Sequence, residues 1–215
     1  MSARLSSGAP AKPATRSLAL ACMVVWLAAA ASTGLLGIWL AIGGAAVGLG
    51  GAVLVLDHAA ARRSLQPSTR LALIGTGAGG LMAAATYLLY PALVRLSPSI
   101  ATDTARLYAS FRALPPVIAS LALLPVIIGE ELVWRGVVQT ELVRRLGPWR
   151  GVILAALAYA LAHAPLGSPL LVAVALLCGI IWGTLRAASG SLVPSLLAHL
   201  VWDVVVFLWL PLDAR

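Results

Sequence analysis

Long apolar runs dominate this 215-residue chain and leave it few ways to fold. Hydrophobic residues make up 61% of the sequence and charged residues 10%, whereas a soluble globular domain is about one-quarter charged. A membrane-spanning helix needs roughly 20 apolar residues, so the sequence can be cut into spans at its charged and Gly/Pro-rich breaks. About seven spans result, at 17–33, 35–56, 71–93, 114–143, 151–165, 168–186 and 190–210. The sequence therefore predicts an all-α fold, a polytopic transmembrane helix bundle.

Positive charges indicate how such a bundle is oriented, because Lys and Arg favour cytoplasmic loops. One side of the predicted bundle receives ten of them, namely Arg4, Lys12, Arg16, Arg62, Arg63, Arg70, Arg144, Arg145, Arg150 and Arg186. The other side receives Arg95, Arg106, Arg112 and Arg215. We therefore predict a cytoplasmic N terminus and an external C terminus. The net charge of +8 does not indicate nucleic acid, because the arginines stand singly or in pairs rather than along one basic face.

The chain divides into three parts. Residues 1–16 are rich in Ala, Ser and Pro and are predicted to form a disordered, basic cytoplasmic tail. A cleaved signal peptide is the alternative, but the long polar start and the six later spans favour an uncleaved first helix. Residues 17–113 are predicted to form N-terminal transmembrane helices, with an interfacial amphipathic stretch or loop at 94–113. Residues 114–210 form the part that is rich in buried polar groups.

Glycines predict where helices pack closely in lipid. Gly44 and Gly48 have GxxxG spacing, and residues 75–80 contain four glycines. The second run matches a dinucleotide fingerprint literally, but no strand precedes it, so close helix packing is the better interpretation.

Ionisable residues inside the predicted spans indicate where function should be sought. Glu130, Glu131 and Arg135 lie in the fourth span, where three charges oppose insertion by roughly 8 to 10 kcal/mol. Glu131 and Arg135 are four residues apart, so we expect them to pair on one face of the helix. Glu130 points about 100° away from Glu131 and is free to face a cavity.

The same spacing recurs in two later spans, with Tyr159 and His163 in the fifth and His199 and Asp203 in the last. Polar contacts that merely join helices are the alternative, since such contacts contribute about 0.6 kcal/mol each. However, three separate helices contribute these groups, and a bundle this rich in Gly and Ala can pack without them. The pattern therefore favours a functional site.

These residues make the chain resemble the CPBP intramembrane endopeptidases, a family that includes CAAX prenyl-protein proteases and bacteriocin-processing or self-immunity proteins. The family has EExxxR, FxxxH and HxxxN or HxxxD motifs on separate transmembrane helices. The sequence has Glu130-Glu131-Leu132-Val133-Trp134-Arg135, Tyr159-Ala160-Leu161-Ala162-His163 and His199-Leu200-Val201-Trp202-Asp203. The resemblance covers residues 114–210, with Tyr159 where Phe is usual, and makes that range the expected catalytic core.

The resemblance implies a glutamic-type endopeptidase that hydrolyses a peptide bond with activated water and needs no metal or other cofactor. Glu130 would be the general base, and His163 would help it to hold the attacking water. His199 would donate to the oxyanion that forms on the scissile carbonyl. Asp203 would orient and charge His199, or would itself be protonated. The supporting residues would be Glu131, Arg135 and Tyr159.

Several other readings use the same side chains. Glu130, His163 and His199 are a legitimate Zn²⁺ ligand set, although HExxH is absent. Ser195 and His199 are one helical turn apart, but no nucleophile-elbow sequence surrounds the serine. A non-catalytic membrane binding or immunity protein would retain the cavity without the reaction. A proton-coupled transporter would show an inverted repeat, and none is apparent.

The expected partners are the lipid bilayer and a membrane-anchored or lipidated protein or peptide. A prenylated protein, a leader peptide and a C-terminal sorting signal all remain open as substrates. The alanine-rich, lysine-poor composition suggests a bacterial inner membrane.

Overall fold

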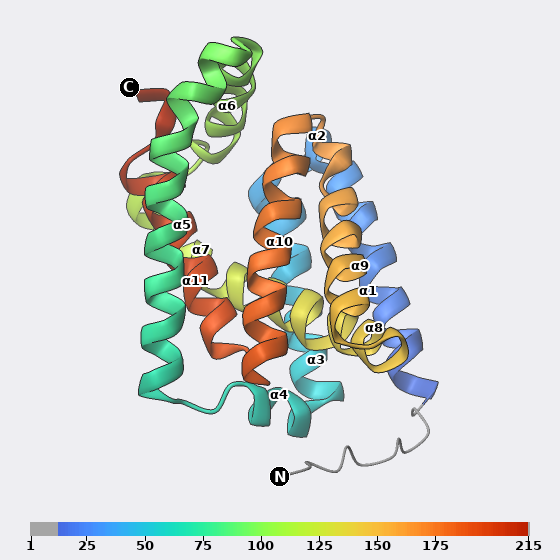
Figure 1. The fold of residues 1–215 in the computed structure, drawn as a ribbon. Helices are drawn as coiled ribbons and strands as arrows, with labels where there is room; N and C mark the ends of the chain where they lie inside the picture. The colour runs from blue at the N-terminus through green and yellow to red at the C-terminus, as the bar shows by residue number, and fades with distance from the viewer. Residues whose placement is uncertain (1–12, 215) are drawn as a thin grey trace.

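The chain folds into a bundle of helices, and the computed structural model describes residues 13–214 (Figure 1). The helices are α1 Pro13–Ala31, α2 Thr33–Leu36, α3 Gly44–Leu56, α4 His58–Ser64, α5 Thr69–Leu96, α6 Ser99–Phe111, α7 Pro116–Glu131, α8 Gln139–Leu146, α9 Pro148–Ala162, α10 Pro169–Ser189 and α11 Val193–Asp203. Shorter π and 3₁₀ segments are η1 Trp39–Gly43, η2 Leu132–Val138, η3 Ala164–Leu166, η4 Val204–Trp209 and η5 Leu212–Ala214. Residues 13–214 contain no strand, so the predicted all-α class is confirmed.

Five of these helical stretches are long and apolar enough to cross a membrane, and two shorter apolar helices accompany them within the described residues. The long ones are Trp39–Leu56, Thr69–Leu96, Pro116–Leu146, Pro148–Leu166 and Pro169–Ser189, and the shorter ones are Arg16–Ala31 and Val193–Trp209. Together they correspond to the seven predicted spans. The protein is therefore an integral membrane protein.

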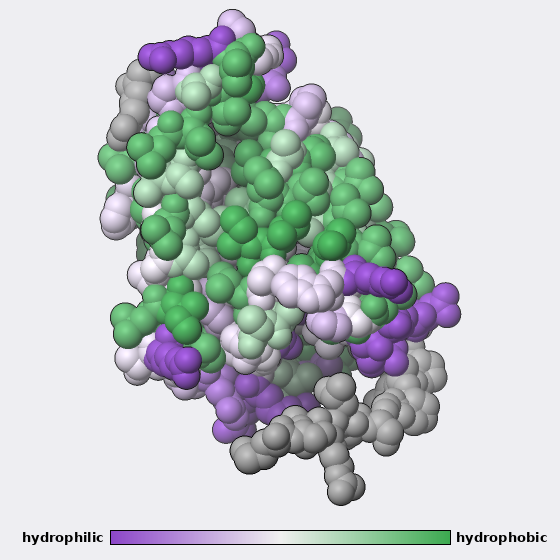
Figure 2. Space-filling view, in the orientation of Figure 1, coloured by the Kyte–Doolittle hydropathy of each residue, from purple (hydrophilic) through white to green (hydrophobic). Residues whose placement is uncertain are grey.

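Hydrophilic residues gather at the two ends of the bundle, and a hydrophobic band lies between them (Figure 2). The end at which α4 lies also receives the start of α1, the α8–α9 turn and the end of α10 (Figure 1). The opposite end receives α6 and the last residues of the chain. Most of the described arginines belong to segments at the α4 end. The prediction of a cytoplasmic N terminus depends on this uneven distribution of positive charge.

Two parts of the predicted organisation need comment. Residues 1–12 of the predicted tail lie outside the described residues, whereas residues 13–16 already belong to α1. The segment 94–113 is mostly helical rather than a loop, because α6 fills most of it. Tyr108 of α6 is buried and donates a hydrogen bond to the carbonyl of Val206, and burial raises the pKa of this phenol. The hydroxyl therefore stays a donor and fixes α6 to η4.

Glycines allow several pairs of helices to approach closely, among them α3 with α7 and α5 with α11, although not all of the predicted glycines do so. A Cβ on Gly50 of α3 would lie 2.5 Å from the Cα of Gly129 in α7, and a Cβ on Gly75 of α5 would meet the backbone of α11. Gly44 and Gly48 have nothing within 4 Å, so the prediction that they pack against a helix of this chain is wrong. The GxxxG spacing gave no information on which face of α3 turns inward. The close α3–α7 contact fixes the position of Gly129, which immediately precedes Glu130.

Candidate active site

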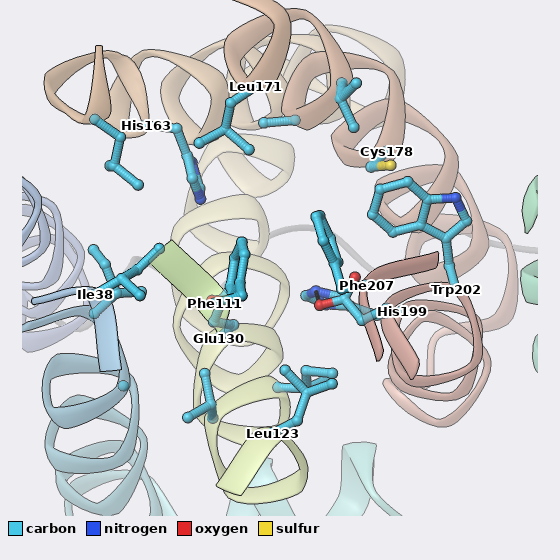
Figure 3. Close-up of a pocket in the computed structure, with 18 of the residues that line it drawn as sticks. Ile38, Phe111, Leu123, Glu130, His163, Leu171, Cys178, His199, Trp202 and Phe207 are labelled. Atoms are coloured by element: carbon cyan, nitrogen blue, oxygen red, sulfur yellow. Dashed lines mark ion pairs between the residues drawn. The ribbon is translucent and has the colours of Figure 1, made fainter. Parts of the chain in front are cut away.

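Polar residues from three helices line one cavity inside the hydrophobic band (Figure 3). It has about 780 Å³ of space between its walls, counting the part open to the outside. The predicted site residues that line it are Glu130, Tyr159, His163, His199 and Asp203. Figure 3 shows Glu130, His163 and His199 around the same space, on different ribbons.

Glu130 reaches this cavity from the end of α7 and is only 7% exposed. The hydroxyl of Tyr159 donates a hydrogen bond to Glu130 Oε2 at 3.0 Å. Glu130 has no ion pair with Arg135, as expected for a neighbour that points about 100° away from Glu131. One carboxylate oxygen is therefore held by a neutral donor, and the group faces the cavity.

Glu131 lies behind the cavity wall and is completely buried. Its Oε1 lies 3.1 Å from an Arg135 guanidinium nitrogen, so the predicted ion pair is present. The same oxygen lies 3.1 Å from Nδ1 of His199, a contact that joins the first motif to the third. The Glu131 Oε2 atom and both terminal nitrogens of Arg135 lack well-aligned hydrogen bonds, so charge attraction dominates this pair.

His199 is 3% exposed and has a carboxylate near each ring nitrogen. Nδ1 faces Glu131, and Nε2 lies 3.5 Å from Asp203 Oδ2. The second distance is too long for a strong hydrogen bond. Asp203 therefore does not hold Nε2 in a strong hydrogen bond, and the His199 ring lines the cavity.

His163 ends α9 at the edge of the cavity, where η3 follows. Its Nδ1 lies 2.7 Å from the carbonyl oxygen of Tyr159, and this oxygen only accepts hydrogen bonds. Nδ1 therefore carries the hydrogen, and in the neutral ring Nε2 is an acceptor. The four-residue spacing of Tyr159 and His163 places Nδ1 at this carbonyl, so Nε2 is the nitrogen left to accept a hydrogen bond.

A comparison of the sequence with known protein families covers the same three motifs. Residues 112–205 match the model of the Rce1-like family, described as type II CAAX prenyl endopeptidases. This part of the chain is similar to the Rce1-like family. The matched range contains all three motifs, which confirms the resemblance to CAAX proteases. Searches of curated proteins and of solved structures found no match.

The match supports, at family level, a CAAX-type intramembrane protease that acts on protein or peptide substrates. The N-terminal helices also contribute to its site. Trp39 and Ile42, which precede the matched range by some 70 residues, line the same cavity. Phe111 and Phe207 both line the cavity and pack against each other, with ring centroids 4.8 Å apart.

Trp182 is another site residue that the motifs did not predict. It lies in α10, which contains none of the three motifs, and it is 2% exposed. Its ring stacks on the His199 ring with centroids 3.8 Å apart and planes 19° apart. A tryptophan in an apolar span reads from sequence as a core residue, and only the packing of α10 on α11 places it beside His199.

Among the described residues, no three His, Cys, Asp or Glu side chains are grouped in a way that could hold a metal ion. Glu130, His163 and His199 line one cavity in the Rce1-like region but are not gathered around one point.

Proposed function

We propose that this protein hydrolyses a peptide bond of a membrane-anchored or lipidated protein, with water activated by Glu130. The observation that supports this most is the division between the two adjacent glutamates. Glu131 is neutralised by Arg135 and His199, whereas Glu130 faces the cavity with a tyrosine hydroxyl as its hydrogen-bond donor. A base must be able to take a proton, and an ion-paired carboxylate does this poorly.

In the proposed reaction, a water molecule lies between Glu130 and the acceptor nitrogen of His163. Glu130 takes a proton from this water while the water oxygen attacks the scissile carbonyl carbon. The carbonyl oxygen then becomes an oxyanion. The C–N bond then breaks, and Glu130 returns the proton to the leaving nitrogen. The products are one new carboxylic acid and one new amine, which together exchange a proton to become carboxylate and ammonium, so the step consumes a single water.

His199 would donate from Nε2 to the oxyanion. Both ring nitrogens lie near carboxylate oxygens, an environment that favours the protonated ring, which has two donors. Glu131 would hold the Nδ1 side, and Asp203 would supply negative charge near Nε2 without a short hydrogen bond. This gives Asp203 the charge role rather than the donor role of an asparagine.

An apolar groove beside the cavity supports a membrane-bound substrate. It runs between α5, α6 and α10, with about 1350 Å³ of space counting the part open to the outside, and its lining is almost wholly hydrocarbon. Leu171, Val174, Cys178, Trp202 and Phe207 line both the groove and the cavity. Its other walls include the exposed residues Leu81 and Leu89 of α5 and Leu177 of α10. The apolar anchor of a substrate would thus lie in the groove while its peptide bond enters the cavity.

The domain roles and location follow from the same reasoning. We assign residues 114–210 as the catalytic core and 17–113 as N-terminal helices with an interfacial segment. The single lysine among 15 basic residues and the high alanine content favour a bacterial inner membrane.

The test is cleavage by purified protein in liposomes, with one peptide sequence presented in prenylated, transmembrane-anchored and soluble forms. We expect cleavage of a membrane-bound form, little cleavage of the soluble form, no effect of a chelator, and a loss of about 10²-fold or more in kcat for His163→Ala. Chelator-sensitive activity restored by zinc would contradict the water mechanism proposed here. No cleavage of any form by folded protein would favour the non-catalytic binding protein.

A further inference from the structure

Trp182 contacts both His199 and Arg135. Its indole stacks on the His199 ring, and the Arg135 guanidinium carbon lies 5.0 Å from its ring centroid. The same guanidinium lies 4.4 Å from the centroid of the Tyr159 ring. The indole therefore borders the two groups that neutralise Glu131. Aromatic faces attract cations within about 6 Å, and tryptophan does so most strongly.

The N–H group of the Trp182 indole does not explain why a tryptophan lies here. Trp182 Nε1 is buried without a hydrogen-bond partner among the described residues. An unpaired buried N–H is unfavourable, and a phenylalanine ring would avoid it. The large indole face is the property of Trp182 that its contacts explain.

The indole is itself held firmly. Tyr159 and Trp202 pack edge-on against it, with centroids 6.5 and 6.2 Å away. The next residue along α10, Gly183, accepts a hydrogen bond from Gln139 Nε2 at 2.8 Å. A Cβ on Gly183 would lie 2.8 Å from Gln139 Oε1, so a larger residue there would displace this amide. The backbone beside Trp182 is thereby fixed to α8.

The His199 ring needs support from such a face. Its two carboxylate partners lie at the ring nitrogens, so they restrain the ring within its own plane. Tilting out of that plane would turn Nε2 away from a developing oxyanion, and a misplacement of about 1 Å costs on the order of 10²-fold in rate. A parallel ring at 3.8 Å blocks this motion on one side.

We propose that Trp182 is a positioning residue for His199, whose protonated ring it holds by its indole face in the orientation that serves the oxyanion. The proposal rests on the proposed function, because it assumes that His199 acts on the substrate. It assigns a role to α10, which the family motifs leave without one.

The test compares kcat and KM for Trp182→Phe and Trp182→Leu, with Trp149→Leu as the matched control. Trp149 is 70% exposed and lies far from the cavity lining. We expect Trp182→Leu to lower kcat about tenfold or more with KM within about twofold, and Trp182→Phe to restore most of kcat. Equal damage by both variants would mean that volume matters rather than the ring face, and unchanged kcat in Trp182→Leu would overturn the proposal.

A second measurement covers the case in which Trp182→Leu does not fold. Site-specific incorporation of increasingly fluorinated tryptophan at position 182 keeps the ring shape and weakens the attraction of its face for a cation. We expect kcat to fall steadily along the series, and a flat series would overturn the proposal. His199→Ala in the same assay separates this result from the proposed function. If that variant stays active, the role of His199 itself is wrong, whereas an inactive His199→Ala with an insensitive position 182 refutes only the present inference.

Discussion

Replacing Arg135 by methionine should destabilise the protein far more than removing a surface arginine. Arg135 is 2% exposed and its carboxylate partner, Glu131, is fully buried. Removing one partner of a buried ion pair costs about 3–5 kcal/mol, because the other charge stays buried without compensation. The guanidinium also lies over the rings of Tyr159 and Trp182, and such contacts contribute up to about 2 kcal/mol when desolvated. Methionine replaces part of this packing, so we expect the free energy of unfolding to fall by about 3–5 kcal/mol.

The assay is reversible unfolding in mixed micelles, followed by circular dichroism as denaturing detergent is added. Arg106→Met is the matched control, because the Arg106 side chain is 78% exposed and lies 4.0 Å from Asp103. A pair of this kind contributes at most about 1 kcal/mol. The double variant Glu131→Gln with Arg135→Met should be more stable than Arg135→Met alone, because it removes the orphaned charge. A double variant with the sum of both losses, or an Arg135→Met as mild as Arg106→Met, would refute this reasoning.

Three further substitutions test the packing and the site. Gly129→Ala should cost about 1–3 kcal/mol in the same unfolding assay, because a Cβ there meets the α3 backbone. The control Gly48→Ala lies in open space and should change the stability by no more than about 0.5 kcal/mol. Equal effects of the two substitutions would contradict the α3–α7 contact. Tyr159→Phe removes one hydrogen bond to Glu130, worth about 0.5–1.5 kcal/mol, so kcat should fall by no more than about tenfold; complete inactivity would give the hydroxyl a larger role. Asp203→Asn should lower kcat by about tenfold if negative charge near the imidazole is needed; preserved or improved activity would mean that only hydrogen-bond donation matters.

The sequence predicted those features that depend on local spacing. Runs of about 20 apolar residues located the seven apolar spans of the described residues, because hydrocarbon thickness sets the length of a span. The four-residue spacing of Glu131 and Arg135 predicted their ion pair, and the adjacent position of Glu130 predicted that it would point elsewhere. Both follow from the geometry of one helix.

Features that depend on how helices meet were not predicted. The contact of Glu131 with His199 joins residues 68 positions apart, and the stacking of Trp182 on His199 depends on the packing of α10. The glycine pattern of α3 likewise gave no sign that Gly50, and not Gly48, turns toward α7. The π segments that follow Glu131 and Asp203 also escaped prediction. Such segments are frequent at functional sites, but no residue type marks them in a sequence.

The central claim is that Glu130 activates the attacking water, and the most direct test is the cleavage rate of Glu130→Gln. The matched control is Glu141→Gln, which changes a carboxylate in the adjoining α8 that instead pairs with Arg144 and Arg145 at 2.8 and 2.6 Å. Both variants keep the shape of the side chain and remove its charge. We predict that Glu130→Gln lowers kcat by about 10²–10⁴-fold, the usual contribution of a general base, while Glu141→Gln stays within a few-fold of the wild type. A folded Glu130→Gln protein that cleaves at the wild-type rate would contradict the account.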